Sequence, residues 1–292
     1  MTIQPFLPFS VAMITPFSQE DEVDANAIHR LVRYYAEHEV PALLVCGSTG
    51  QQHSLTVDER ILLYRTVKDA APEHMPLYAG VAAIRTRDAI RLAEQAQLAG
   101  YAGIMLGFPP YVRPSQREAA LYAEAVCSAT SLPIMLYNNP VRTGFNLETD
   151  TLFQLVNQFP QINALKETGS PEHVRRVKTR LGSSFQVLSG YDLTIAEYSA
   201  MGYDGLTSVA GNLFPREMMR ITELLRAGNT EHANRELAQI HTSLETLGAI
   251  GWIRVIQHVF AKQGMTSGHV RDPLTPLTAE EQAVLTQIIP IP

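Results

Sequence analysis

Cysteine is scarce in this chain, and so are basic charge and long apolar runs. Two cysteines, Cys46 and Cys127, among 292 residues cannot form the disulfide framework of a small secreted domain. The formal net charge of -6 argues against a nucleic-acid partner, because such binding requires a basic surface. No stretch reaches the roughly 18 apolar residues of a membrane span, and the opening MTIQPFLPFS lacks the basic segment of a signal peptide. We therefore expect a cytoplasmic protein that does not cross a membrane.

The chain is instead rich in short apolar runs that alternate with longer stretches of helical period. Eight such units follow one another over roughly 225 residues, a pattern typical of an α/β protein with a (β/α)8 TIM barrel. The runs are too apolar to face solvent on one side, which agrees with a parallel sheet covered by helices. The apolar runs occupy residues 11–17, 42–47, 76–81, 101–107, 133–139, 162–168, 185–191 and 203–212.

The stretches between the runs carry helix signals. Ile28, Leu31, Val32 and Tyr35 follow the i, i+3, i+4, i+7 spacing of one helix face. Residues 230–292 read as further helices, and no flexible linker precedes them. We therefore expect the barrel to occupy residues 1–228, with the active site at the C-terminal ends of its strands. Residues 229–292 should form a C-terminal helical extension packed on it.

Lys166 stands in INALKETG (162–169), at the end of the sixth apolar run. A lysine is ordinarily a solvated surface charge, and for Lys166 taken alone this is the simpler interpretation. At the end of a central barrel strand, however, a lysine is partly desolvated and its neutral amine is favoured. Such an amine can form a Schiff base with a carbonyl compound. Glu167 should face the opposite way or structure a loop, since neighbouring strand residues alternate.

Four other residues near strand ends could complete a site around this lysine. Tyr137 ends the fifth run and could transfer protons, although a packed core tyrosine fits its position equally well. Arg142 follows shortly and offers a planar fork for a carboxylate, or else a surface ion pair. Ser48 and Thr49 stand in a glycine-flanked turn whose N–H and hydroxyl groups suit a small anion, although such turns are common.

Other chemistries have less support in the sequence. The nine histidines show no HExxH or paired-ligand spacing, so no metal site is indicated. Neither a P-loop nor a G-x-S-x-G motif occurs. The glycine of SVAGN (208–212) keeps a sugar-phosphate enzyme open as a competing class, because barrels often bind phosphate near their last strands.

Taken together, the motifs resemble the dihydrodipicolinate synthase / N-acetylneuraminate lyase family of pyruvate-dependent class I aldolases. The resemblance covers almost the whole chain, and order and spacing agree. It implies a barrel, Schiff-base chemistry with pyruvate through Lys166, no cofactor, and a homo-oligomer, usually a tetramer built as a dimer of dimers. The motifs are GSTGQ (47–51), PPYVRPSQ (109–116), YNNPVRTG (137–144), ALKETG (164–169), SGYD (189–192), SVAGN (208–212) and LTPLT (274–278).

The resemblance also implies roles for single residues. Lys166 matches the lysine that forms the imine with pyruvate, and Tyr137 matches the tyrosine of the proton relay. Ser48 and Thr49 match the hydroxyl pair in the turn that holds the pyruvate carboxylate, and Ser48 also belongs to the relay. Tyr111 matches the tyrosine that crosses a dimer interface to complete the relay in the synthases.

The second substrate is implied by a different set of residues. Arg142 matches the arginine that binds the carboxylate of this substrate in the synthases, and Gly190 and Val209 belong to the same substrate site. The leading expectation is therefore condensation of pyruvate with aspartate semialdehyde. The alternative is an aldolase that cleaves a 2-keto-3-deoxy sugar acid or N-acetylneuraminate, because GSTG and SGYD are closer to the lyases. A non-catalytic barrel that binds a keto acid is a second alternative, although a binder needs no nucleophile.

Three positions depart from the pattern of the synthases. Gln51 replaces the usual glutamate and removes a charge beside the anion-binding turn. Ile84 and Pro110 stand where lysine-inhibited synthases carry an asparagine and a tyrosine. Strong inhibition by lysine is therefore not expected.

Overall fold

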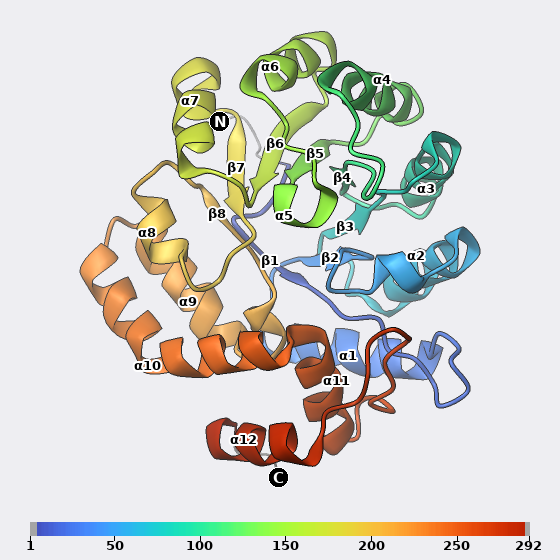
Figure 1. Ribbon diagram of the computed structural model, residues 1–292, viewed down its shortest axis with the longest axis vertical. Helices are drawn as coiled ribbons and strands as arrows, with labels where there is room; N and C mark the ends of the chain where they lie inside the picture. Colours follow the sequence, from blue (N-terminus) through green and yellow to red (C-terminus); the bar gives the residue numbers. More distant parts are fainter. Residues whose placement is uncertain (1–4, 290–292) are drawn as a thin grey trace.

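Eight parallel strands close into a barrel in the computed structural model, which describes residues 5–289 (Figure 1). The strands follow their order in the chain, and β8 pairs with β1 to close the ring. The predicted barrel is thus confirmed. The strands are β1 (Phe9–Ala12), β2 (Leu43–Val45), β3 (Leu77–Gly80), β4 (Gly103–Gly107), β5 (Ile134–Asn138), β6 (Ile162–Glu167), β7 (Gln186–Ser189) and β8 (Gly205–Ser208).

Helices surround the barrel, and Figure 1 shows the last three on the side of α1 and α9. Of these, α10 packs against α8, α9, α11 and α12. Within residues 5–289, no helix has the length and apolar character needed to span a membrane. The helices are α1 (Ala25–Glu37), α2 (Val57–Ala70), α3 (Thr86–Leu98), α4 (Gln116–Cys127), α5 (Pro140–Thr143), α6 (Thr149–Gln158), α7 (Pro171–Leu181), α8 (Ile195–Ser199), α9 (Pro215–Arg226), α10 (Thr230–Ile250), α11 (Trp252–Lys262) and α12 (Ala279–Ile288), with short 3-10 turns η1 (Gln52–Ser54) and η2 (Ala210–Asn212).

The first strand lies earlier in the chain than its apolar run predicts. The run covers residues 11–17, whereas β1 spans Phe9–Ala12. A last hydrogen bond joins the N–H of Met13 to the carbonyl of Leu44 at 3.1 Å. Pro16, which has no N–H, cannot continue the ladder. The apolar run therefore signalled burial correctly but placed the strand too late.

Alternation along β5 and β6 decides which side chains enter the barrel. Ala164 belongs to the cluster that fills the barrel interior, and Leu165 belongs to the cluster between the sheet and the helices. Because successive strand residues point to opposite faces, Lys166 returns to the interior at the carboxyl end of β6. The same alternation places Met135 and Tyr137 on the interior side of β5. The barrel thus presents an amine and a phenol side by side at one end.

Gly205 provides a test of how the barrel closes. An ideal Cβ at this position would lie 2.0 Å from the carbonyl oxygen of Pro8, which precedes β1. We expect Gly205→Ala to lower the free energy of unfolding by about 3 kcal/mol, the upper end of the usual cost of overpacking, because backbone rather than a flexible side chain must move. Urea denaturation measures this change.

Gly228→Ala is the matched control, because its surroundings are open and only its positive φ of 75° is unfavourable. That strain should cost only about 1 kcal/mol. Equal losses of stability in the two variants would contradict the idea that the close contact of Gly205 with Pro8 requires a glycine there.

Candidate active site

The carboxyl ends of β5 and β6 bring Tyr137 and Lys166 together. The two residues pair directly across the strands, and the Lys166 amine lies 4.8 Å from the centroid of the Tyr137 ring. Lys166 is only 5% exposed. Within residues 5–289, its amine forms neither a hydrogen bond nor an ion pair. The amine is therefore held out of water next to an aromatic face, without a carboxylate to anchor its charge.

Burial is the main reason that the pKa of Lys166 falls from 10.5 to about 8. The guanidinium of Arg142 lowers this pKa further, whereas the carboxylate of Asp192 opposes the fall. Desolvation disfavours the charged form of an amine, so the neutral and nucleophilic form is accessible near neutral pH. Lys166 thus has the electronic state that imine formation requires.

Gly190, at the end of β7, makes room for the lysine side chain. An ideal Cβ at this position would lie 2.7 Å from Cε of Lys166 and 2.5 Å from the methyl carbon of Thr168. Any larger residue would push the amine away from its place. Gly190, predicted as part of the substrate site, is therefore in contact with the candidate nucleophile.

On the opposite side of β6, Glu167 faces the surrounding helices and is fully buried. Its carboxylate accepts hydrogen bonds from the amide of Asn138 at 3.0 Å and from the N–H of Gly169. It also lies 2.6 Å from Nδ1 of His173 on α7. This network joins the ends of β5 and β6 to α7 and so fixes the backbone that carries Tyr137 and Lys166. The sequence analysis did not identify Asn138 or His173.

The phenol of Tyr137 has a close partner that the sequence analysis missed. Nδ2 of Asn139 donates a hydrogen bond to the Tyr137 hydroxyl oxygen at 2.6 Å. Burial raises the pKa of Tyr137, and this hydrogen bond is the largest of the effects that oppose the rise. The sequence signal for Asn139 was the pair of asparagines in YNNP, directly after the tyrosine.

The turn formed by residues 47–50 borders the same chamber. Ser48 and Thr49 both line it together with Lys166 and Tyr137. The backbone N–H groups of Ser48 and Thr49 donate to no residue in the described part of the chain. Two uncommitted donors in a turn beside a buried amine can hold a small anion. Ser48 lies in this wall but forms no hydrogen bond with Tyr137 within residues 5–289.

Tyr111 lies away from this chamber. Its side chain is 90% exposed and its φ is 74°, an uncommon conformation for a residue with a side chain. It is not among the residues that line the Lys166 chamber. A single chain therefore does not bring Tyr111 to Lys166.

Three hollows share Arg142 in their linings. The chamber that holds Lys166 has a volume of about 70 Å³, and a hollow of about 320 Å³ lies beside it, next to His53 and Phe108. A third, of about 450 Å³, is lined by Tyr191, Trp252 and their neighbours. Arg142 lines all three, and its guanidinium has no hydrogen bond or ion pair with a residue in the range 5–289. An anionic group entering from either side would meet a free guanidinium.

Asp192, in the loop after β7, is a further buried charge that the sequence analysis did not single out. Its carboxylate accepts hydrogen bonds from the Ser208 hydroxyl and from the N–H groups of Val209 at 3.1 Å and Ala210 at 3.2 Å. Burial raises its pKa, and these hydrogen bonds and Lys166 oppose the rise. Asp192 thus fixes Val209, a predicted site residue that lines the Lys166 chamber. The only sequence signal was its place in SGYD.

No metal-ligand set accompanies these residues. Within the described range, no group of three or more histidine, cysteine, aspartate or glutamate side chains could hold a metal ion. The reactive groups of the chamber are therefore the amine, the phenol and the turn.

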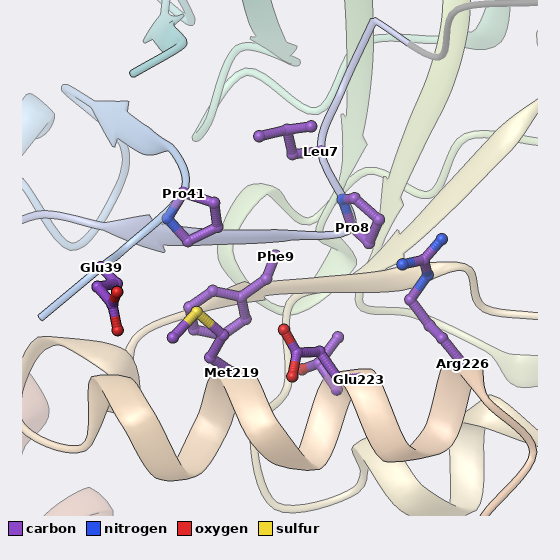
Figure 2. A pocket seen from close by; sticks show the side chains of 9 residues that line it. Leu7, Pro8, Phe9, Glu39, Pro41, Met219, Glu223 and Arg226 are labelled. Atoms are coloured by element: carbon purple, nitrogen blue, oxygen red, sulfur yellow. The ribbon is translucent and has the colours of Figure 1, made fainter. Parts of the chain in front are cut away.

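A separate hollow of about 420 Å³ lies at the opposite end of the barrel, where β1 and β2 begin (Figure 2). Leu7, Pro8 and Pro41 form one side of it, and Met219 and Arg226 of α9 form another. Its lining contains neither lysine nor tyrosine. We therefore assign the candidate active site to the carboxyl end, where active sites of such barrels lie.

The chain is similar to known proteins over almost its whole length. A model of the dihydrodipicolinate synthetase family matches residues 5–291. The chain is 34% identical to 4-hydroxy-tetrahydrodipicolinate synthase 1 of Halalkalibacterium halodurans, over 94% of this chain and 93% of that protein. It is also 34% identical to 4-hydroxy-tetrahydrodipicolinate synthase of Chlorobium luteolum, over 97% and 96%. The crystal structure of dihydrodipicolinate synthase from Aquifex aeolicus superposes with a TM-score of 0.93 at 30% identity and covers 97% of both chains.

The buried amine predicts a stability cost that depends on pH. Below pH 8, Lys166 is charged in both the folded and the unfolded chain, and its lowered pKa costs about 3 kcal/mol at about 1.4 kcal/mol per unit. As the pH rises from about 8 towards 10.5, the folded chain sheds the proton first and this cost shrinks. We therefore expect Lys166→Met to raise the free energy of unfolding at pH 7 and to lose that gain at higher pH. Urea denaturation of both chains at several pH values measures this difference in the free energy of unfolding.

Lys178→Met is the control, because Lys178 forms an ion pair with Asp204 at 2.6 Å and should destabilise the chain when removed. A loss of stability in Lys166→Met at pH 7 would show that the amine is not desolvated.

Proposed function

We propose, for a chain that belongs to the dihydrodipicolinate synthetase family, a cytoplasmic, pyruvate-dependent lyase that forms a Schiff base and condenses pyruvate with aspartate semialdehyde. The observation that carries this proposal is the buried amine of Lys166, whose pKa is lowered to about 8 beside Tyr137. Relatives named 4-hydroxy-tetrahydrodipicolinate synthase over nearly the whole chain support the same activity. The electron sink is the imine formed on Lys166, and the proposal requires no further cofactor.

In the first step, the neutral amine of Lys166 attacks the ketone carbon of pyruvate. The free N–H groups of Ser48 and Thr49 hold the pyruvate carboxylate meanwhile. One proton of the amine moves to the ketone oxygen to give the carbinolamine, and Tyr137 then gives a second proton to this hydroxyl group, which leaves as water and yields a protonated imine. The proton balance closes when the phenolate regains a proton in the next step.

In the second step, the protonated imine withdraws electrons and a methyl proton leaves to give an enamine. The enamine carbon attacks the aldehyde of the second substrate, a carbon–carbon bond forms, and the Tyr137 phenol gives its proton to the new alkoxide. Water then hydrolyses the new imine and releases the product from Lys166. Arg142, whose guanidinium is free, binds the carboxylate of the second substrate.

We further propose that the active form is a homo-oligomer in which Tyr111 of the partner subunit completes the proton relay. Tyr111 is exposed, and so are the apolar side chains of Ile84, Val112 and Val141. Exposed apolar groups of this kind are typical of surfaces that another chain covers. This arrangement would supply the group that a single chain does not place in the chamber.

Trapping with borohydride tests the nucleophile directly. Incubation with pyruvate and borohydride should add the mass of one reduced pyruvyl group to Lys166, because reduction fixes the imine. The rate of trapping should rise with pH, since only about a tenth of an amine with a pKa near 8 is neutral at pH 7. Mass spectrometry of the intact protein and of its peptides measures both. Lys166→Ala is the control, and a wild-type chain that gains no mass at saturating pyruvate would refute the proposed function.

Arg142 provides a separate test of the second substrate. We expect Arg142→Gln to raise KM for aspartate semialdehyde by about 10- to 100-fold, because a hydrogen-bonded charge pair is lost. Pyruvate trapping on Lys166 should remain. Arg142→Lys, which keeps the charge but not the planar fork, should give an intermediate KM in steady-state assays. An unchanged KM in both variants would mean that Arg142 does not bind this carboxylate.

One observation favours a second candidate, an aldolase for a larger 2-keto acid such as a 2-keto-3-deoxy sugar acid. The hollow beside Gly190 has about 450 Å³ and is lined by Tyr191, Tyr198 and Trp252. It offers more room and more aromatic surface than a four-carbon aldehyde can fill. Release of pyruvate from a panel of sugar acids, compared with condensation with aspartate semialdehyde, distinguishes the two candidates.

A further inference from the structure

The side-chain amide of Asn139 is held at both of its ends. Its oxygen caps helix α5 by accepting a hydrogen bond from the N–H of Arg142 at 3.1 Å. Its nitrogen donates to the hydroxyl oxygen of Tyr137 at 2.6 Å. Asn139 is 5% exposed, so water competes weakly for either contact. Because only the oxygen can accept the capping N–H, the cap fixes the nitrogen as the end that faces the phenol.

This donor restricts where the phenol can send its own proton. A phenol has one O–H donor, and Asn139 already occupies part of the acceptor capacity of its oxygen. The Tyr137 proton must therefore point away from Asn139. Tyr137 lines the chamber that also holds Lys166 and Ser48, and the Lys166 amine stands over its ring. The chamber, whose lining also includes the hydrogen-bonding side chain of Thr168 beside the phenol, is thus the side left for the phenol to act on.

The same hydrogen bond favours the charged state of the phenol. Burial makes a phenolate costly, and an N–H aimed at the oxygen recovers part of that cost. The amide is locked by the cap before any substrate arrives, so the donor needs no reorganisation when the charge forms.

We propose that Asn139 is a positioning residue that directs the Tyr137 hydroxyl into the Lys166 chamber and stabilises the phenolate that it becomes. When the carbinolamine loses water, Tyr137 gives its proton to the departing hydroxyl group and is left as a phenolate. The phenolate then removes a proton from the methyl group of the imine, which returns the phenol and yields the enamine. The inference rests on the proposed function, because it requires the imine on Lys166.

Two substitutions remove the donor and keep the cap. Serine and aspartate both cap helices well, so Asn139→Ser and Asn139→Asp should leave α5 and the backbone of Arg142 in place. Neither carries the amide N–H, and the hydroxyl of serine, the one donor that remains, sits on a side chain one bond shorter. We expect Asn139→Ser to lower the rate of pyruvate trapping on Lys166 at pH 7 about tenfold. This is the usual size of the effect of one lost hydrogen bond. Asn139→Asp should be slower still, because its carboxylate attracts the Tyr137 proton away from the chamber.

The pH dependence separates this role from a merely structural one. Without the amide donor, the pKa of Tyr137 should rise further, since the largest effect that opposes burial is removed. The pH profile of the trapping rate in Asn139→Ser should therefore shift to higher pH. Asn157→Ser, an exposed change on α6, is the matched control and should trap at the wild-type rate. Circular dichroism melting of every variant checks that the fold is retained.

A double-mutant cycle with Tyr137→Phe gives the decisive outcome. If Asn139 acts through the phenol, Asn139→Ser should change the trapping rate less than about twofold in the Tyr137→Phe background. The same tenfold loss in that background would overturn the inference, as would a wild-type rate in Asn139→Ser alone. A wild-type chain that traps no pyruvate would refute the proposed function instead, so the two failures are distinct.

Discussion

The desolvated amine of Lys166 is the constraint on which the carboxyl end of this barrel depends. A charged amine out of water without a carboxylate is unfavourable, and the fold tolerates it only because neighbouring groups hold the lysine in place. Glycine at position 190 leaves space for the side chain, and the ring of Tyr137 offers its face to the amine. Asp192 lies near enough to raise the lysine pKa, but its carboxylate is committed to Ser208 and two backbone N–H groups. The carboxylate of Asp192 therefore limits the fall in the pKa of Lys166 but does not form an ion pair with its amine.

The inward face of β5 and β6 carries the candidate reactive groups, and the outward face carries the hydrogen bonds that hold the strand ends in place. Tyr137 and Lys166 point into the barrel, while Asn138 and Glu167 point outward and bind each other at 3.0 Å. Glu167 also contacts His173 of α7, which joins the strand ends to this helix. The positions of Tyr137 and Lys166 are fixed as a result. A change in the outward network should thus act on the inward pair through the backbone. The same strand alternation that builds the core also aligns the amine with the phenol.

Much of this arrangement could be predicted from sequence, because it follows from strand periodicity. Lys166 and Tyr137 end adjacent apolar runs, and parallel strands bring such ends to one edge, where Ser48 and Thr49 also lie. Contacts made by loop side chains carry no such periodic signal. The bond from Asn139 to Tyr137 and the role of Asp192 in holding the loop after β7 therefore emerged only from the fold. The start of β1 was wrong for a related reason, since apolar residues are buried both inside and beyond a strand.

The sizes of the hollows separate the imine-forming step of the proposed reaction from the step that involves the second substrate. The Lys166 chamber, at about 70 Å³, suits a molecule as small as pyruvate, and its walls supply the amine, the phenol and the turn. The flanking hollows, at about 320 and 450 Å³, both share Arg142 with it, and they differ from each other in their other walls. In the proposed reaction, imine formation therefore depends on the small chamber, whatever the second substrate. Substitutions at Trp252 can alter the choice of that substrate without disturbing Lys166, because Trp252 lines the larger hollow and not the Lys166 chamber.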